Sequence, residues 1–253
     1  MESPNTKQNG EIEAQLAELL RTCAENEENQ RNVDIAHRIA DLCEQKGDLH
    51  SALEWYKYTS ALLSNTDPGL TRKAFEVELK VIDASISEDE EWLREHSTSE
   101  KADEVRKDLD CLKDRKAHAL IDETRKRVRR NPNDFLSHFE LGEQLLAAGD
   151  PAAAIPELQQ GRKNPKVHYK AMSLLGDCYD QKHMFDFAVH SYEDACKEMV
   201  KMDDLKKEVT YKLGLLYERM GNRQACLERL KEIYDVDYSY KDVAQRVEGS
   251  YAK

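Results

Sequence analysis

Glycine and proline are scarce in this sequence of 253 residues, with 10 and 6 occurrences. Because these residues mark most turns, their scarcity predicts few turns and a predominance of helix. Long apolar runs are also missing, since no segment approaches the roughly 18–20 residues that a membrane-spanning helix needs. The first ten residues, MESPNTKQNG, lack the basic stretch and following apolar run of a signal peptide. We therefore expect a soluble cytoplasmic protein without membrane contact.

Motifs for metals, cofactors and catalysis are absent as well. The sequence has no CxxC, CxH or HExxH spacing, so we predict no metal site. It also has no GxGxxG, GxxxxGKS/T or GxSxG motif, so we predict no cofactor and no catalytic residues. The six cysteines lie in a long chain without a secretion signal, which favours free thiols over disulfides.

Basic residues are fewer than acidic residues. Lys and Arg number 38 against 50 Asp and Glu, which gives a formal net charge of -12. Phosphate-bearing partners require a basic face, so this balance argues against nucleic acid and anionic membranes. Charged residues make up 35% of the chain, against a usual value of about 25%. This fraction favours a surface-rich helical shape such as a solenoid.

What the sequence does contain is a repeat. Gly142, Gly176 and Gly214 each follow a Leu, and each precedes a large, a small and a second large residue at offsets of three, twelve and sixteen. These residues are Leu145, Ala154 and Leu158 after Gly142; Tyr179, Ala188 and Tyr192 after Gly176; and Tyr217, Cys226 and Leu230 after Gly214. Small residues let two antiparallel helices approach closely, while the large ones fill the space between them. A fourth copy, AHRIADLCEQKGDLHSALEWY, has Ala40 at the glycine position and Tyr56 at the last large position.

This pattern resembles the tetratricopeptide repeat (TPR), in which L-G-x2-Y, a small residue and an aromatic residue recur over 34 residues. Residues 100–253 further resemble a group of bacterial TPR proteins in the segments RRNPND, FELGEQLLAAGDPAAAIPEL and KEIYDVDYSYKDVAQRV. The resemblance implies an all-α fold, a TPR-type α-α solenoid with a right-handed superhelix. It also implies a non-catalytic scaffold or adaptor that binds proteins. It names neither a partner nor an oligomeric state.

The copies are interrupted after the first one. Two long amphipathic stretches, 69–95 and 100–130, predict a helical hairpin inserted between the first and later repeats. The 102 residues from Ala40 to Gly142 equal three periods of 34, so two degenerate repeats are the alternative. The predicted organisation is a disordered tail over 1–10, an N-terminal helix with the first TPR-like helix pair over 11–66, the long charged hairpin over 67–131, three TPR motifs over 132–240, and a C-terminal capping helix over 241–253.

TPR proteins generally bind extended peptides on their concave face, and the resemblance places that face on the first helix of each pair. The groove residues it implies are Phe139, Glu143, Lys170, Asp177, Asp180, Tyr211 and Glu218. Family members that hold a C-terminal carboxylate carry Lys and Asn at two of these places, where this chain has Phe139 with Glu143, Ser173 with Asp177, and Tyr211 with Leu215. That binding mode therefore does not carry over. The excess of acids predicts a basic or amide-rich partner segment, with Phe139 and Tyr211 as apolar anchors; the alternative is that the acids are solvated surface.

One basic cluster precedes the later repeats and consists of Arg125, Lys126, Arg127, Arg129 and Arg130. It fits a helix C-terminus, where the macrodipole favours cations. The competing hypothesis for function is an RNA-associated helical-repeat protein that docks through this segment.

Cys178 and His183 lie close together in the segment LLGDCYDQKHMFDFA, which raises the question of a nucleophile and a base. In the repeat frame Cys178 lies on the packing face, where a buried Cys acts as a small hydrophobe. His183 takes the place where the other copies have Gly47, Gly149 and Gly221, so we predict a left-handed turn there. Packing and a turn are therefore the preferred interpretation.

Overall fold

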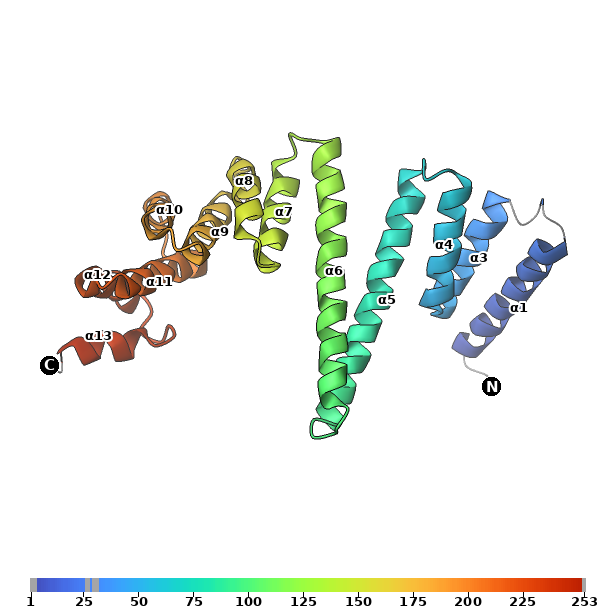
Figure 1. Ribbon diagram of the computed structural model, residues 1–253, viewed down its shortest axis with the longest axis horizontal. Helices are drawn as coiled ribbons and strands as arrows, with labels where there is room; N and C mark the ends of the chain where they lie inside the picture. Colours follow the sequence, from blue (N-terminus) through green and yellow to red (C-terminus); the bar gives the residue numbers. More distant parts are fainter. Residues whose placement is uncertain (1–3, 26–27, 29–31, 252–253) are drawn as a thin grey trace. The chain divides into compact units, whose positions relative to one another are not determined.

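The computed structural model describes residues 4–25, 28 and 32–251, and every regular element within them is an α-helix (Figure 1). The helices are α1 (Pro4–Glu25), α3 (Val33–Lys46), α4 (Leu49–Leu62), α5 (Pro68–Glu95), α6 (Ala102–Arg130), α7 (Phe135–Ala147), α8 (Pro151–Gly161), α9 (His168–Gln181), α10 (Phe185–Glu198), α11 (Asp204–Arg219), α12 (Arg223–Tyr234) and α13 (Val243–Tyr251). The predicted all-α class is confirmed for these residues.

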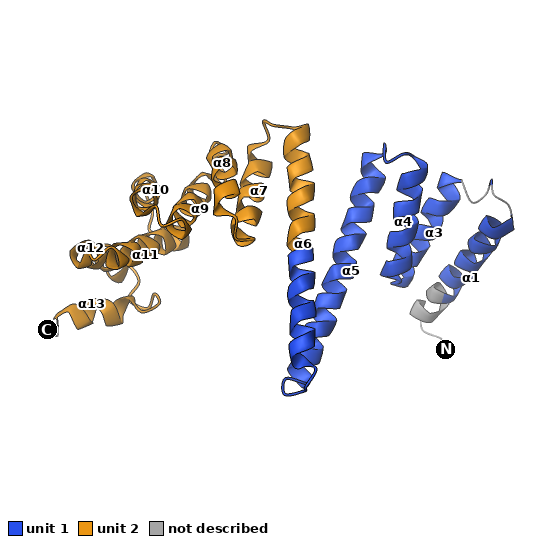
Figure 2. Ribbon diagram, in the orientation of Figure 1, with its two compact units in different colours: residues 1–116 blue, residues 117–253 orange. Residues whose placement is uncertain are grey.

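The chain divides into two compact units, residues 1–116 and 117–253, and the division falls inside α6 (Figure 2). In unit 1, α3 and α4 form a helix pair. Asn32 caps the start of α3, Gly47 ends it in the left-handed conformation with φ of 86°, and Asp48 caps α4. The large residue of this pair, Tyr56, is completely buried between the helices.

The remaining helices of unit 1 pack on this pair from both sides: α1 contacts α3, and α5 contacts α4. Asp67 caps α5, and Pro68 occupies its first turn, where a missing N–H costs nothing. Ion pairs join α5 to the first half of α6, including Lys113 Nζ to Glu90 Oε1 at 2.7 Å and Lys116 Nζ to Asp83 Oδ1 at 2.5 Å.

The N-terminus differs from the predicted disordered tail over 1–10. Helix α1 begins at Pro4, and residues 1–3 lie outside the described residues. Proline is well suited to a first helical turn, and each residue added to an existing helix gains one hydrogen bond. The helix formed by the amphipathic residues 11–25 therefore continues through the polar segment before it.

Unit 2 contains three successive helix pairs, α7 with α8, α9 with α10 and α11 with α12, followed by α13. The predicted contacts between small and large residues are present in each pair. A Cβ added to Gly142 would lie 2.6 Å from Leu158 Cγ, and one added to Gly176 would lie 2.3 Å from Tyr192 Cε1. These helices approach so closely because the glycines have no side chain.

The turns between paired helices also follow the repeat. Gly149 and Gly221 both have φ of 79°, and His183 has φ of 57°. The predicted left-handed turn at His183 is thus confirmed. At the C-terminal end, Val243 and Val247 of α13 pack in one apolar cluster with Leu230 and Ile233 of α12. Helix α13 therefore covers the apolar face that the last pair would otherwise expose.

Candidate functional site

One hollow on the first helices of these pairs lies between α9 and α11 of unit 2. Its volume is about 420 Å³, and helix α10 contributes one residue to its lining. The lining consists of charged groups around one aromatic and one aliphatic side chain: Asp177, Asp180, Tyr192, Lys212, Leu215, Glu218 and Arg219. Three of these, Asp177, Asp180 and Glu218, belong to the groove predicted from the sequence.

Asp177 is held by two donors. The Tyr192 hydroxyl donates to Asp177 Oδ1 at 2.6 Å, and Lys212 Nζ donates to Oδ2 at 2.9 Å. Burial and the neighbouring carboxylate strongly raise the pKa of Tyr192, so this hydroxyl remains a donor. Burial opposes the charge of Lys212, but Asp177 and Glu208 outweigh burial and raise its pKa. Asp177 is therefore a structural acceptor as well as a wall of the hollow.

Only one of the two carboxylate oxygens of Asp180 has a partner among the described residues. Its Oδ2 pairs with Arg219, whose side chain is 53% exposed and lies over the Phe185 ring at 5.8 Å from the centroid. Its Oδ1 is buried and accepts no hydrogen bond from any residue that the structure describes. A buried acceptor without a donor costs about 1–3 kcal/mol. The hollow is therefore lined by a carboxylate, that of Asp180, with one oxygen that would gain from an N–H donor.

Glu218 of the hollow is bonded to α13, and Tyr211 is bonded to Asp242, the residue just before α13. Glu218 Oε2 accepts from Arg246 Nη1 at 2.7 Å, and the Tyr211 hydroxyl donates to Asp242 Oδ1 at 2.7 Å. Partial burial, followed by the hydrogen bond to Asp242, raises the pKa of Tyr211 to about 12. Lys241 Nζ lies over the Tyr211 ring at 4.4 Å from the centroid. Tyr211 is thus part of the capping contact and does not line the hollow.

These pairs change the electrostatics expected for the groove. The lining of the hollow has three acids against two bases, a formal charge of -1, and the cations come from α11. The sequence pattern suggested a surface dominated by acids because it did not show that Lys212 and Arg219 face Asp177 and Asp180 across the helices. The lining of the hollow therefore carries cationic donors beside carboxylate acceptors.

The other predicted groove residues are scattered. Phe139 is 5% exposed and belongs to the core, so it cannot serve as a surface anchor. The reason is Gly161, where an added Cβ would lie 2.7 Å from Phe139 Cα; helix α8 presses directly on this part of α7. Glu143 and Lys170 are exposed, and neither lines the hollow between α9 and α11.

The basic cluster is largely matched by acids of the same chain. Arg125 pairs with Asp122, Lys126 with Glu123, and Arg127 with Glu140. These pairs leave the cluster's two remaining cations, Arg129 and Arg130, both exposed, without an ion pair among the described residues. Since phosphate binding depends on several free cations, the segment offers less than its sequence suggested.

Cys178 is completely buried. Burial, assisted by the nearby Asp177 carboxylate, raises the pKa of its thiol to about 12, so the reactive thiolate is scarce at neutral pH. All six cysteines are free, and Cys111 is the exposed one. The preferred interpretation of Cys178 as packing agrees with this geometry.

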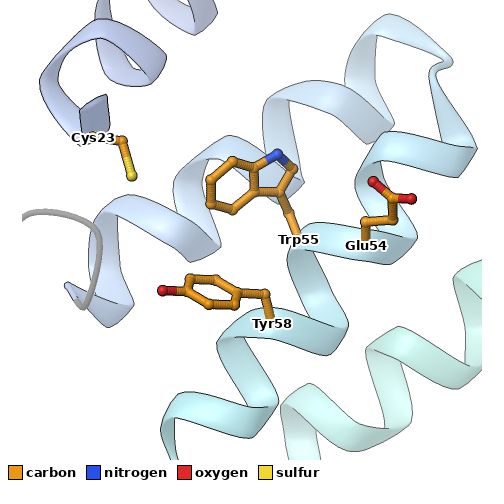
Figure 3. Close-up of a pocket in the computed structure, with 4 residues that line it drawn as sticks. All are labelled: Cys23, Glu54, Trp55 and Tyr58. Carbon is orange, nitrogen blue, oxygen red and sulfur yellow. The ribbon is translucent and has the colours of Figure 1, made fainter. Parts of the chain in front are cut away.

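A second hollow lies in unit 1, with a volume of about 390 Å³ and a lining of Cys23, Glu54, Trp55 and Tyr58 (Figure 3). The two aromatic rings meet edge to face, with centroids 5.8 Å apart and planes at 88°. The sequence analysis did not single out these residues. The available signal was the spacing of Trp55 and Tyr58, which places both on one side of α4.

The described residues contain no group of three or more His, Cys, Asp or Glu side chains that could hold a metal ion. None of their helices has the length and apolar character required to cross a bilayer.

Comparisons with known proteins found matches among solved structures. No protein-family model matches the chain, and no curated protein matches it. Among solved structures it is similar to MamA, with 19% identity over 57% of this chain and 82% of that chain at a TM-score of 0.48. It is also similar to YrrB, described as a TPR protein with an unusual peptide-binding site, with 17% identity over 93% and 98% of the two chains and a TM-score of 0.48. The Naa15/Naa10 complex bound to HypK-THB matches 98% of this chain and 38% of that chain, with 13% identity and a TM-score of 0.56.

The paired helices and the small-to-large contacts between them give the chain a fold that resembles a TPR-type helical-repeat solenoid. The likeness concerns architecture alone.

Proposed function

We propose that this protein is a non-catalytic interaction scaffold in the cytoplasm, which holds an extended segment of a protein partner in the hollow between α9 and α11. The observation that carries the proposal concerns Asp180, which lines a hollow of about 420 Å³ and whose buried Oδ1 has no hydrogen-bond donor among the described residues. A partner's N–H group would satisfy this oxygen and recover its desolvation cost.

The rest of the lining supports a peptide as the occupant. Lys212 and Arg219 supply donors, and Asp177 and Asp180 supply acceptors, which matches the alternating C=O and N–H groups of an extended chain. Leu215 adds an apolar surface between them. Helical-repeat proteins offer such extended faces to partners as a consequence of their geometry.

The proposal can be tested without knowing the natural partner. A phage-displayed library of random dodecapeptides is panned against the intact chain, and the Kd of the enriched synthetic peptide is measured by fluorescence anisotropy. Leu215→Trp fills the hollow, and Ala152→Trp places the same indole ring at an exposed position of α8. We expect Leu215→Trp to weaken binding at least tenfold and Ala152→Trp to leave it unchanged.

Circular dichroism of both variants checks that the helices remain folded. Equal affinity of the wild type and a folded Leu215→Trp variant would show that peptides bind elsewhere. Failure of the panning to enrich any peptide would also contradict the proposal.

A further inference from the structure

The polar arrangement around Asp180 occurs twice in the chain, once in each unit. In unit 1, Tyr56 on the second helix of a pair donates to Asp41 and Glu44, which lie three residues apart on the first helix. In unit 2, Tyr192 likewise lies opposite Asp177 and Asp180. In each unit the helix that follows the pair supplies two cations seven residues apart. These cations are Lys73 and Lys80 of α5 in unit 1, and Lys212 and Arg219 of α11 in unit 2.

The unit 1 arrangement is saturated. Glu44 accepts from the Tyr56 hydroxyl at 3.0 Å, and its two oxygens pair with Lys73 Nζ at 2.9 Å and Lys80 Nζ at 2.6 Å. Partial burial acts to raise the pKa of Glu44, but these three donors outweigh burial and lower the pKa to about 2. Both carboxylate oxygens of Glu44 therefore have a partner.

The unit 2 arrangement is one donor short. Asp180 stands where unit 1 has Glu44, and its side chain is one methylene shorter. Arg219 pairs with Asp180 Oδ2, while the Tyr192 hydroxyl bonds to Asp177 Oδ1. Among the described residues, no donor reaches the buried Asp180 Oδ1, whereas both oxygens of Glu44 in unit 1 have donors.

On this basis, and building on the proposed function, we infer that the hollow between α9 and α11 is a socket for one cationic side chain, a Lys or Arg of the partner segment. The lining carries a formal charge of -1, and this value does not change when the partners Glu208 and Arg246 are included. One incoming cation neutralises it, and a charge-assisted hydrogen bond to Asp180 is of the stronger kind.

The surrounding side chains suit the rest of such a residue. Leu215 offers an apolar wall to the methylene stem, which Lys and Arg bury readily. Arg219 is half exposed, so it can move aside, and the terminal torsion of an Asp side chain is soft enough to turn either oxygen toward the hollow. Arg219 thus acts as an internal competitor for the same carboxylate.

The test uses N-acetyl-arginine amide and N-acetyl-citrulline amide, which have nearly the same shape and differ in charge. Each is titrated into the intact, isotopically labelled protein and followed by NMR. We expect the arginine probe to shift the amide signals of Asp180, Lys212 and Leu215 saturably, with an affinity at least tenfold higher than that of the citrulline probe. The signals of Glu44 and Tyr56 should not move, because the unit 1 arrangement is already saturated.

Three variants sharpen the test. Asp180→Asn should lower the affinity for the arginine probe at least tenfold, whereas Glu228→Gln, an exposed acid on α12, should leave it unchanged. Arg219→Met should raise the affinity, because it removes the competing cation; a lower or equal affinity would overturn the inference.

The outcomes separate the socket from peptide binding in general. Equal binding of arginine and citrulline probes, or no saturable binding of either, would overturn the socket even if a selected peptide binds in the hollow. Arginine-selective binding that depends on Asp180 would support it even if no peptide is enriched by panning.

Discussion

The substitution Gly176→Ala tests the helix contact on which the site depends. An added Cβ would lie 2.3 Å from Tyr192 Cε1, 2.6 Å from Cδ1 and 2.7 Å from Cζ. Tyr192 is 1% exposed, so its ring has little room to retreat. The ring can give way only by moving its hydroxyl, which bonds to Asp177.

Three contributions determine how much Gly176→Ala changes the free energy of unfolding. Overpacking a core costs about 1–3 kcal/mol, and loss of a hydrogen bond to a charged acceptor costs about 1.5–3 kcal/mol. Alanine favours the helix by about 1 kcal/mol relative to glycine. We therefore expect Gly176→Ala to lower the free energy of unfolding by about 1.5–5 kcal/mol.

The matched control is Gly214→Ala, at the same place in the next repeat. There the nearest atom to an added Cβ is Leu230 Cδ2 at 3.3 Å, the end of a flexible side chain. Helix propensity should then dominate, and the protein should be unchanged or more stable by up to about 1 kcal/mol.

The assay is urea denaturation of the intact chain, followed by circular dichroism and by tryptophan fluorescence. Both tryptophans, Trp55 and Trp92, lie in unit 1, so fluorescence reports that unit, while circular dichroism reports all helices. We expect Gly176→Ala to shift the circular-dichroism transition to lower urea. If Gly176→Ala and Gly214→Ala have the same midpoint, the account of the contact between α9 and α10 is wrong.

Three further outcomes follow from the same contacts. The pKa of Glu44 is lowered to about 2. The ionised Glu44 side chain therefore contributes fully to stability above its ordinary pKa of 4.5, and this contribution is lost as the pH falls from 4.5 toward 2. Glu44→Gln should flatten this part of the pH profile of the unfolding free energy, and an unchanged profile would refute the prediction. Native-state alkylation should label Cys111 fast and Cys178 slowly, because Cys178 is buried with a raised pKa; mass spectrometry of the tryptic peptides measures both rates, and comparable rates would contradict the burial. Asp177→Lys should lower the melting temperature by calorimetry, because it places a cation against Lys212 and removes the acceptor of the Tyr192 hydroxyl; a melting temperature equal to that of the wild type would show that Asp177 is only a surface acid.

The helical architecture could be predicted from the sequence because it depends on local rules. The spacing of Gly176, Ala188 and Tyr192 encodes which residues meet between two helices of a pair. The left-handed turn at His183 followed from the glycines at the equivalent turns. Both features concern residues less than a repeat apart, where the helix period fixes which side chains face each other.

The electrostatics of the site could not be predicted in the same way. The pair of Lys212 with Asp177 joins residues 35 apart on helices from different repeats, so it depends on how one pair stacks on the next. The burial of Phe139 depends on Gly161 at the end of α8, a contact outside the repeat pattern. The sequence predicted an acidic groove with Phe139 as an apolar anchor. The structure has instead a hollow lined by acids and bases, and Phe139 lies in the core.

The most direct test of the central claim is to find where a bound peptide lies. A peptide enriched by panning is synthesised with photo-leucine at one position, irradiated on the intact protein and mapped by mass spectrometry after digestion. The account predicts adducts in residues 174–181 and 211–219, the parts of α9 and α11 around the hollow. Adducts concentrated in residues 49–62, around Trp55 and Tyr58 of the unit 1 hollow, or spread evenly over the chain, would contradict it.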